Sequence, residues 1–160
     1  MLKPMLIIAA LVAAAPGALA HGPGGHGSHG HTQELAYGKP GDPAKPAREI
    51  VVDMIEKDGR MLFVPERIEV KVGEQVRFRL RNLGELEHEF ILGTAEEIDE
   101  HAELMRAMPE MDHDDPNGKK LSKKTEGDLV WHFTQAGEFE FACLIPGHRE
   151  VGMAGTIVVR

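Results

Sequence analysis

The stretch Cys143-Leu-Ile-Pro-Gly-His148-Arg-Glu-Val-Gly-Met153 contains the only cysteine of the 160-residue chain. It places a thiolate, an imidazole and a thioether five residues apart, with a Pro-Gly turn between the first two. A further imidazole, His88, lies upstream among alternating apolar residues. Two histidines, one cysteine and a weak axial methionine form the trigonal copper sites that exchange electrons. The sequence therefore predicts one copper site with the ligands His88, Cys143, His148 and Met153.

An alternation of apolar and polar residues predicts β-strands over residues 49–92. Three of these strands are the clearest, at about 50–55, 67–72 and 75–80. Towards the end of this segment, His88 shares its parity with Phe90 and Leu92, so its side chain is expected to point inward. An inward histidine is also a common hydrogen-bonded core residue, so the position of His88 alone leaves both roles open.

A second β segment is expected from about residue 128 to the C-terminus. Apolar residues alternate from Leu129 to Phe133 and again from Phe139 to Cys143. This alternation makes the Cys143 sulfur leave the end of a strand pointing inward. A fold of two packed β-sheets can bring such a strand end against a strand from the middle of the chain. The pattern therefore allows Cys143 and His88 to meet.

The first twenty residues have the features of an export signal. Lys3 gives a positive start, residues 5–15 are apolar, and Ala18-Leu19-Ala20 has the small-residue pattern of a cleavage site. The apolar run is shorter than the roughly 20 residues that span a bilayer. We therefore expect a signal peptide over residues 1–20, cleavage after Ala20, and a periplasmic protein without a membrane span.

The charge of the chain excludes one class of partner. The sequence has 18 basic and 26 acidic residues, and loss of Lys3 with the signal leaves 17 basic residues. Nucleic-acid binding needs clustered lysine and arginine, so we expect no nucleic-acid partner, whereas a basic docking partner stays open. The remaining length suits one domain of ordinary size.

A single cysteine in an exported chain cannot form an internal disulfide. Its thiol is either bound to a metal or buried as a small apolar side chain. Its neighbours Ala142 and Leu144 lack the histidines through which multicopper oxidases relay electrons, and a binuclear electron-entry site needs a second cysteine. A cysteine hydrolase could use His148 as a base but would have no use for Met153. We therefore expect no enzymatic activity.

Six short motifs are spread between residues 48 and 160: Phe63-Val64-Pro65, Val72-Gly73-Glu74, Asn82, His88-Glu89-Phe90, Gly137-Glu138-Phe139, and Cys143 through Gly155. With these motifs the chain resembles the cupredoxins, the small blue-copper proteins. The resemblance implies an all-β fold, a Greek-key cupredoxin β-sandwich over residues 49–160 with a short helical insert. It also implies His88, Cys143 and His148 as equatorial ligands and Met153 as the axial ligand of a type 1 copper.

The resemblance extends to the surroundings of the ligands. The four-residue gaps on each side of His148 are similar to those of rusticyanin and auracyanin. Cupredoxins often brace the ligand loop at the positions of Asn82 and Glu89, although either residue could instead be a solvated polar residue. If His148 reaches solvent as in the family, the apolar residues around it, Ile145 among them, could dock a periplasmic redox partner, or they could belong to the core.

Residues 21–48 are rich in histidine, glycine and proline and lack apolar periodicity, so a flexible arm is expected. The arm carries four histidines separated mainly by glycine, namely His21, His26, His29 and His31. They could hold an auxiliary copper ion, with His21 also offering its α-amino group. The alternative is a solvated low-complexity arm.

An acidic insert is expected over residues 93–127. Thr94 and Glu97 form a capping-box pattern that opens a helix reaching about Ala107. His101, Met105 and Met108 share one face of this helix, and Met111 and His113 follow it. We expect Ile98, Met105 and Met108 to form a stripe that packs on the core, and the alternative is that the thioethers form a soft Cu(I) site.

Two roles are compatible with such a copper site. The protein could bind or oxidise excess copper and so confer copper tolerance, or it could carry single electrons between periplasmic redox partners. The histidine-rich arm and the insert are most similar to the periplasmic copper-tolerance cupredoxins of the CopI type. The resemblance therefore favours copper tolerance.

Overall fold

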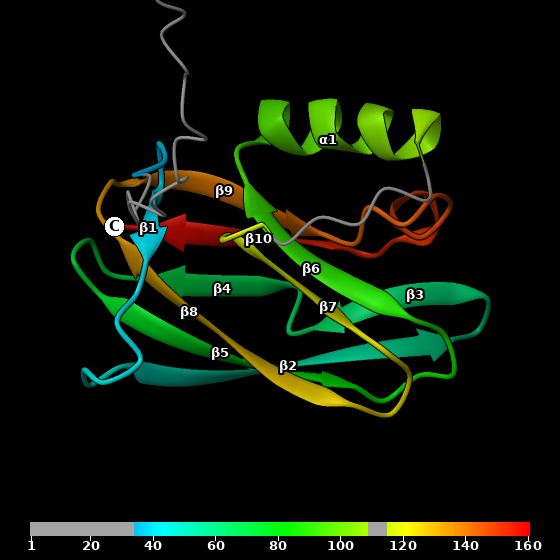
Figure 1. Cartoon of the computed structure of the whole chain (residues 1–160), viewed down its shortest axis with the longest axis horizontal. Coiled ribbons are helices and arrows are strands. Elements are labelled where there is room, and N and C mark those ends of the chain that lie inside the picture. The colour runs from blue at the N-terminus through cyan, green and yellow to red at the C-terminus, as the bar shows by residue number, and fades with distance from the viewer. Residues whose placement is uncertain (1–33, 109–114) are drawn as a thin grey trace, which may run out of the picture. The chain divides into compact units, whose positions relative to one another are not determined.

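A computed structural model describes residues 34–108 and 115–160, which form two packed β-sheets with one helix (Figure 1). The first sheet has the order β1 (Gly38–Pro40), β8 (Glu126–Phe133), β5 (Gln75–Asn82), β2 (Arg48–Lys57) and β3 (Arg60–Val64). The second has the order β4 (Arg67–Val70), β10 (Ala154–Val159), β9 (Gly137–Ala142), β6 (His88–Gly93) and β7 (Gly118–Leu121). The remaining elements are α1 (Ala95–Ala107) and the 3₁₀ turn η1 (Arg149–Val151). The predicted β-sandwich is confirmed.

Aromatic side chains from both sheets fill the space between them. Phe78 of the first sheet packs against Phe90 of the second with ring centroids 5.3 Å apart, and Phe63 packs against Phe141 at 5.2 Å. All four rings are fully buried, because the period-two alternation of each strand directs them to one face. Burial of such rings is the main favourable contribution to folding, and it holds the two sheets against each other.

The strand register brings the candidate ligands to one end of the second sheet. β6 runs antiparallel to β9, with Ile91 opposite Ala142, so the start of β6 lies beside the chain that follows β9. β10 pairs with the other edge of β9, and Ala154 also lies opposite Ala142. Residues separated by more than fifty positions in the sequence therefore meet just beyond Ala142.

Two short strands differ from the sequence expectations. The segment predicted as a flexible arm over 21–48 contains β1, which pairs with β8, and Tyr37 beside it is fully buried. The insert predicted over 93–127 contains β7, which pairs with β6. Both strands are short and carry little apolar alternation, so their pairing depends on the neighbouring strand and not on their own sequence. Residues 1–33, including the expected signal, lie outside the described residues.

Helix α1 follows the predicted capping box. The Thr94 side chain accepts a hydrogen bond from the Glu97 backbone N–H, and the Glu97 carboxylate accepts one from the Thr94 N–H. The helix buries Ile98 and Met105 in a cluster that includes Leu144. The expectation that Met108 joins this stripe is wrong, because the helix ends at Ala107 and Met108 is 46% exposed.

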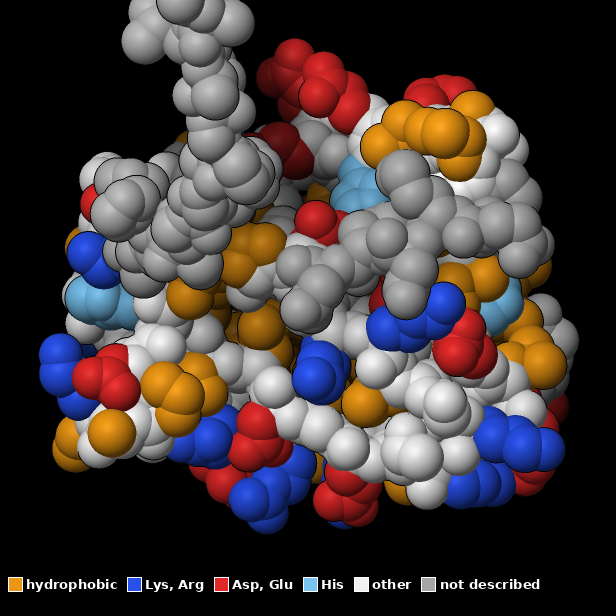
Figure 2. Space-filling view, in the orientation of Figure 1, with side chains coloured by type: hydrophobic (Ala, Val, Ile, Leu, Met, Phe, Trp, Pro, Cys, Tyr) orange, Lys and Arg blue, Asp and Glu red, His pale blue; other side chains and the backbone are white. Residues whose placement is uncertain are grey.

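The surface of the described residues carries both signs of charge. In the view of Figure 2, acidic and basic side chains are intermingled over the lower part of the molecule. Many of them are paired, as in the contacts of Arg81 with Asp53 and of Arg77 with Asp128. Within the described ranges, no helix has the length and apolar character needed to cross a bilayer.

Candidate metal centre

Three of the predicted ligand side chains converge at the end of the second sheet. The Nδ1 atoms of His88 and His148 are 3.1 Å apart, and the His148 Nδ1 is 3.3 Å from the Cys143 Sγ. One donor atom from each of the three residues lies within 4.8 Å of the others. Among the described residues, this is the one group of three or more His, Cys, Asp or Glu side chains that could hold a metal ion.

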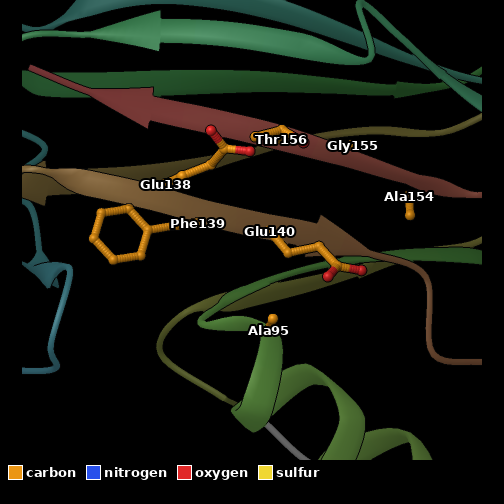
Figure 3. A pocket seen from close by; sticks show the side chains of 7 residues that line it. All are labelled: Ala95, Glu138, Phe139, Glu140, Ala154, Gly155 and Thr156. Atoms are coloured by element: carbon orange, nitrogen blue, oxygen red, sulfur yellow. The ribbon is translucent and has the colours of Figure 1, made fainter.

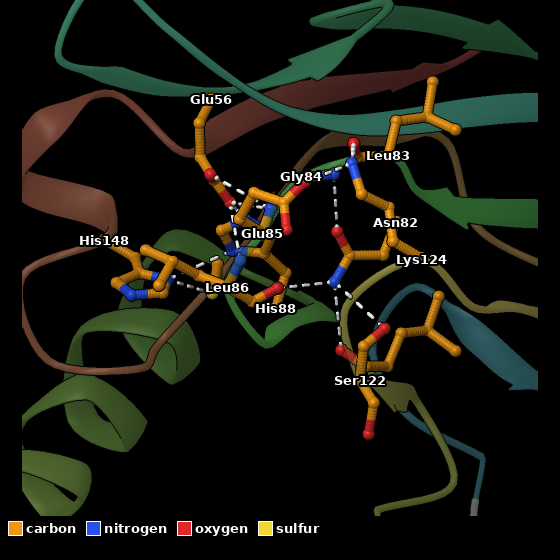
Figure 4. A network of polar contacts seen from close by, with 12 residues as sticks. Glu56, Asn82, Leu83, Gly84, Glu85, Leu86, His88, Ser122, Lys124 and His148 are labelled. Atoms are coloured by element: carbon orange, nitrogen blue, oxygen red, sulfur yellow. Dashed lines mark hydrogen bonds and ion pairs between the residues drawn. The ribbon is translucent and has the colours of Figure 1, made fainter.

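His88 stands at the first position of β6 and is fully buried. Its Nε2 atom lies 2.9 Å from the Oε1 atom of Glu56, and its Nδ1 atom faces His148 (Figure 4). The two ring nitrogens are thus used differently, one toward a carboxylate and the other toward the cluster. The carboxylate contact fixes the orientation of the ring, as such contacts do for metal-binding histidines.

Cys143 directly follows β9 and is also fully buried. Its backbone N–H donates to the Met153 carbonyl at 3.1 Å, which closes the ligand loop at its base. The Cys143 Sγ accepts the backbone N–H of Glu89 at 3.4 Å. An N–H donor directed at sulfur stabilises a thiolate, so this contact partly offsets the effect of burial on the Cys143 thiol.

Hydrogen bonds within the loop 144–152 fold it into tight turns. The His148 N–H donates to the Ile145 carbonyl at 3.0 Å, and the Met153 N–H donates to the His148 carbonyl at 3.1 Å. Gly147 and Gly152 have φ angles of 93° and 111°, which glycine adopts with least strain. These turns direct the His148 ring toward Cys143 while leaving it partly exposed.

Met153 follows the loop and is fully buried in the core cluster that also contains Cys143. The backbone contact between the two residues keeps them adjacent. A buried thioether at this point suits a weak axial ligand. The axial role of Met153 stays a prediction.

Glu89 and Asn82, the two residues expected to support the ligand loop, act at different places. The Glu89 side chain, only 3% exposed, accepts the backbone N–H of Leu144 at 2.8 Å and so holds the residue after Cys143. Asn82 instead organises the turn before His88: its Oδ1 accepts the Gly84 N–H, and its Nδ2 donates to the Leu86 carbonyl (Figure 4). Glu89 therefore braces the ligand loop, and Asn82 braces the approach to His88.

The protonation of the cluster follows from its burial. Burial raises the pKa of the Cys143 thiol to about 12, although the Glu89 N–H donor opposes this shift. Burial also lowers the pKa of His148, and the nearby His88 lowers it further. At neutral pH the metal-free site thus holds a neutral thiol and a neutral His148 imidazole, so metal binding must displace the thiol proton.

The donor set fits a first-row metal ion. Metal–nitrogen and metal–sulfur bonds of about 2.0–2.3 Å put donor atoms roughly 3–4 Å apart. The 3.1 and 3.3 Å separations of the cluster are in this range. Structural zinc sites are completed by a fourth histidine, cysteine or carboxylate, whereas the residue adjacent here is a methionine, which favours copper.

Comparison with known proteins identifies the family of the chain. The family model described as "Copper binding proteins, plastocyanin/azurin family" matches residues 50–160. The chain belongs to this family of copper-binding cupredoxins. The cupredoxin is 48% identical to the "Copper-resistant cuproprotein CopI" of Rubrivivax gelatinosus, over 99% of this chain and 97% of that protein.

Solved structures show the same fold. Auracyanin B has a TM-score of 0.60 and 20% identity, covering 78% of this cupredoxin and 96% of auracyanin B. A multicopper oxidase has a TM-score of 0.51 and 20% identity, but the match covers 72% of this chain and only 45% of the oxidase. The likeness to both establishes the cupredoxin fold and nothing about activity.

The structure describes only some of the residues expected at auxiliary copper sites. The four arm histidines, Met111 and His113 lie outside the described residues. Met105 is buried in the cluster beneath α1, so it packs as a core residue in this cupredoxin. His101 lies 3.9 Å from the Asp115 carboxylate.

An open hollow beside the start of α1 contains none of the candidate ligands (Figure 3). It is lined by Ala95, Glu138, Phe139, Glu140, Ala154, Gly155 and Thr156. Of its two carboxylates, Glu140 is paired with Arg149. The hollow therefore offers no metal site comparable to the cluster at Cys143.

Glu56 is a site residue that sequence analysis missed. It belongs to β2 of the first sheet, whereas His88 belongs to the second. Burial raises the pKa of the Glu56 carboxyl, but the hydrogen bonds from the Glu85 and Leu86 backbone and from His88 outweigh it, and the net shift is downward. A glutamate near a strand end is common on protein surfaces, so nothing in the local sequence distinguishes it.

Copper binding is expected to release a proton at neutral pH. Because the Cys143 thiol is protonated up to a pKa of about 12, thiolate coordination transfers about one proton to solvent for each Cu(II) bound. Apparent affinity should therefore rise about tenfold per pH unit between pH 7 and 9. Calorimetric titration in buffers of different ionisation enthalpy measures this release. Uptake of Cu(II) without proton release would show that the sulfur does not coordinate.

Proposed function

We propose that the protein binds one type 1 copper through His88, Cys143 and His148, with Met153 as the axial ligand, and that this site confers copper tolerance in the periplasm. The observation that carries the proposal is the convergence of three donor atoms: the His88 and His148 Nδ1 atoms are 3.1 Å apart, and the His148 Nδ1 is 3.3 Å from the Cys143 Sγ. The relative from Rubrivivax gelatinosus, named as copper-resistant, supports the physiological role.

The protein part of the site suits redox chemistry. Bound copper would exchange one electron between its Cu(I) and Cu(II) states. Glu56 orients His88, Glu89 holds the chain after Cys143, and the turns of the ligand loop hold His148. A scaffold that fixes three donors before the metal arrives limits rearrangement during electron transfer.

The surroundings of Cys143 favour binding over catalysis. Ala142 and Leu144 flank it, so the histidine relay of a multicopper oxidase is missing. Across residues 34–108 and 115–160, no second group of three or more His, Cys, Asp or Glu side chains could hold further metal. We therefore infer a copper-binding protein without enzymatic activity.

A mobile electron carrier is the second candidate function. It is favoured by the partial exposure of His148, whereas His88 and Cys143 are fully buried. Leu86 and Val151 are 45% and 39% exposed, and Ile145 is half-buried against the core. Leu86, Val151 and Ile145 could therefore contact a redox partner. Leu144 could not, because it is buried beneath α1.

Growth on copper distinguishes the two functions. A strain that lacks the gene is expected to grow poorly on elevated copper and to recover with the wild-type gene. His148→Gln removes a ligand and should fail to restore growth. His132→Gln is the matched control, because His132, on β8, contacts the Gly73 carbonyl and not the cluster. Normal copper growth together with slowed respiration in the deletion strain would favour the carrier.

A further inference from the structure

We propose that Glu56 is a positioning residue that holds His88 in the tautomer able to bind copper and places a negative charge behind it that favours Cu(II) over Cu(I). The proposal rests on the proposed copper site and adds a control of its redox balance. Its basis is the contact between the Glu56 Oε1 and the His88 Nε2 at 2.9 Å (Figure 4).

The tautomer follows from the chemistry of the contact. An ionised carboxylate only accepts hydrogen bonds, so the Nε2 atom of His88 must carry the proton. In a neutral imidazole the other nitrogen then has a free lone pair, and this Nδ1 atom is the one that faces His148. Glu56 therefore selects the nitrogen that is available to a metal.

The chain around Glu56 is built to hold the carboxylate in this place. The backbone N–H groups of Glu85 and Leu86 each donate to Oε1 at 3.0 Å. A Cβ atom at Gly84 would collide with the same Oε1, so glycine at this position lets the Glu56 carboxylate stay where it is. Three donors and a glycine thus surround one carboxylate oxygen.

The charge of Glu56 is not neutralised by a lysine or arginine. Across the described ranges its salt-bridge contact is with His88 alone, and a neutral imidazole does not cancel the charge. Other carboxylates of the same turn are paired with cations: Glu85 with Lys124 and Glu87 with Lys120. An unneutralised negative charge one imidazole away from the metal stabilises the more positive oxidation state.

Glu56→Gln tests the charge separately from the geometry. A glutamine carbonyl at the Oε1 position keeps the three hydrogen bonds made there, while the charge and the second acceptor of the Glu85 N–H, Oε2 at 3.1 Å, are lost. We expect Cu(II) affinity to fall roughly 10- to 100-fold, with a smaller loss for Cu(I), and the reduction potential to rise. Glu85→Gln is the matched control: it removes the same charge from the same turn but from a paired, exposed side chain, and should change the affinity ratio less than about twofold.

A second measurement uses the copper-free protein. Nitrogen-15 NMR of His88 is expected to show the Nε2–H tautomer in the wild type and in Glu56→Gln, and a mixture of tautomers in Glu56→Ala. An Nδ1–H tautomer in the wild type would overturn the proposal. If the wild type binds copper and Glu56→Gln leaves the ratio of Cu(II) to Cu(I) affinity unchanged, the proposal is also overturned. Failure of the wild type to bind copper through its thiolate would refute the proposed function and leave the tautomer result intact.

Discussion

Replacing Glu89 with alanine is expected to lower the free energy of unfolding by about 2–3 kcal/mol and to weaken copper binding. The Glu89 carboxylate accepts the Leu144 N–H at 2.8 Å in an environment where only 3% of the residue is exposed. Alanine removes this acceptor and leaves a buried donor without a partner, which costs far more than an exposed hydrogen bond. Because Leu144 directly follows Cys143, the thiolate also loses part of its support.

The matched variant is Glu89→Gln, which keeps a carbonyl oxygen for the Leu144 N–H. Urea denaturation of the two copper-free variants at pH 7 measures the difference. Glutamine should retain more than half of the stability that alanine loses. Equal stability of Glu89→Ala and the wild type would show that the contact does not support the ligand loop.

The candidate ligands could be picked out from the sequence because their residue types and spacing indicate their chemistry. Cys143, His148 and Met153 lie in one short loop, and the parity of β6 predicted the inward direction of His88. The structure confirms the convergence of His88, Cys143 and His148. The start of α1 could also be predicted from a local pattern, since the Thr94 and Glu97 capping box depends on residues three positions apart.

Features that depend on distant pairing could not be predicted. The edge strand β7 has the sequence Gly-Lys-Lys-Leu, which carries no strand signal and forms because β6 offers it hydrogen bonds. Tyr37 is buried because β1 lies along β8. Glu56 reaches His88 only because the turn after Asn82 lies against β2, where the Leu83 N–H donates to the Met54 carbonyl. Each of these contacts joins segments whose pairing no local pattern specifies.

Cys143→Ser is expected to remove the copper site altogether. The substitution replaces the thiolate by a hydroxyl of similar shape, so the buried position after β9 should fold as before. Changes in the groups that merely support metal ligands cost about 10- to 100-fold in affinity, and loss of the thiolate itself should exceed that range. Its soft sulfur also favours copper over the harder first-row metals.

The most direct measurement is the absorption spectrum of copper-free wild-type protein and Cys143→Ser during titration with Cu(II). Imidazoles elsewhere in the chain could take up Cu(II), but only Cys143 can give thiolate-to-copper absorption, because it is the single cysteine. We expect intense visible bands that saturate at one equivalent of copper in the wild type and are missing in Cys143→Ser. A wild-type protein without these bands, or a serine variant that retains them, would contradict the assignment of Cys143 to a type 1 copper centre.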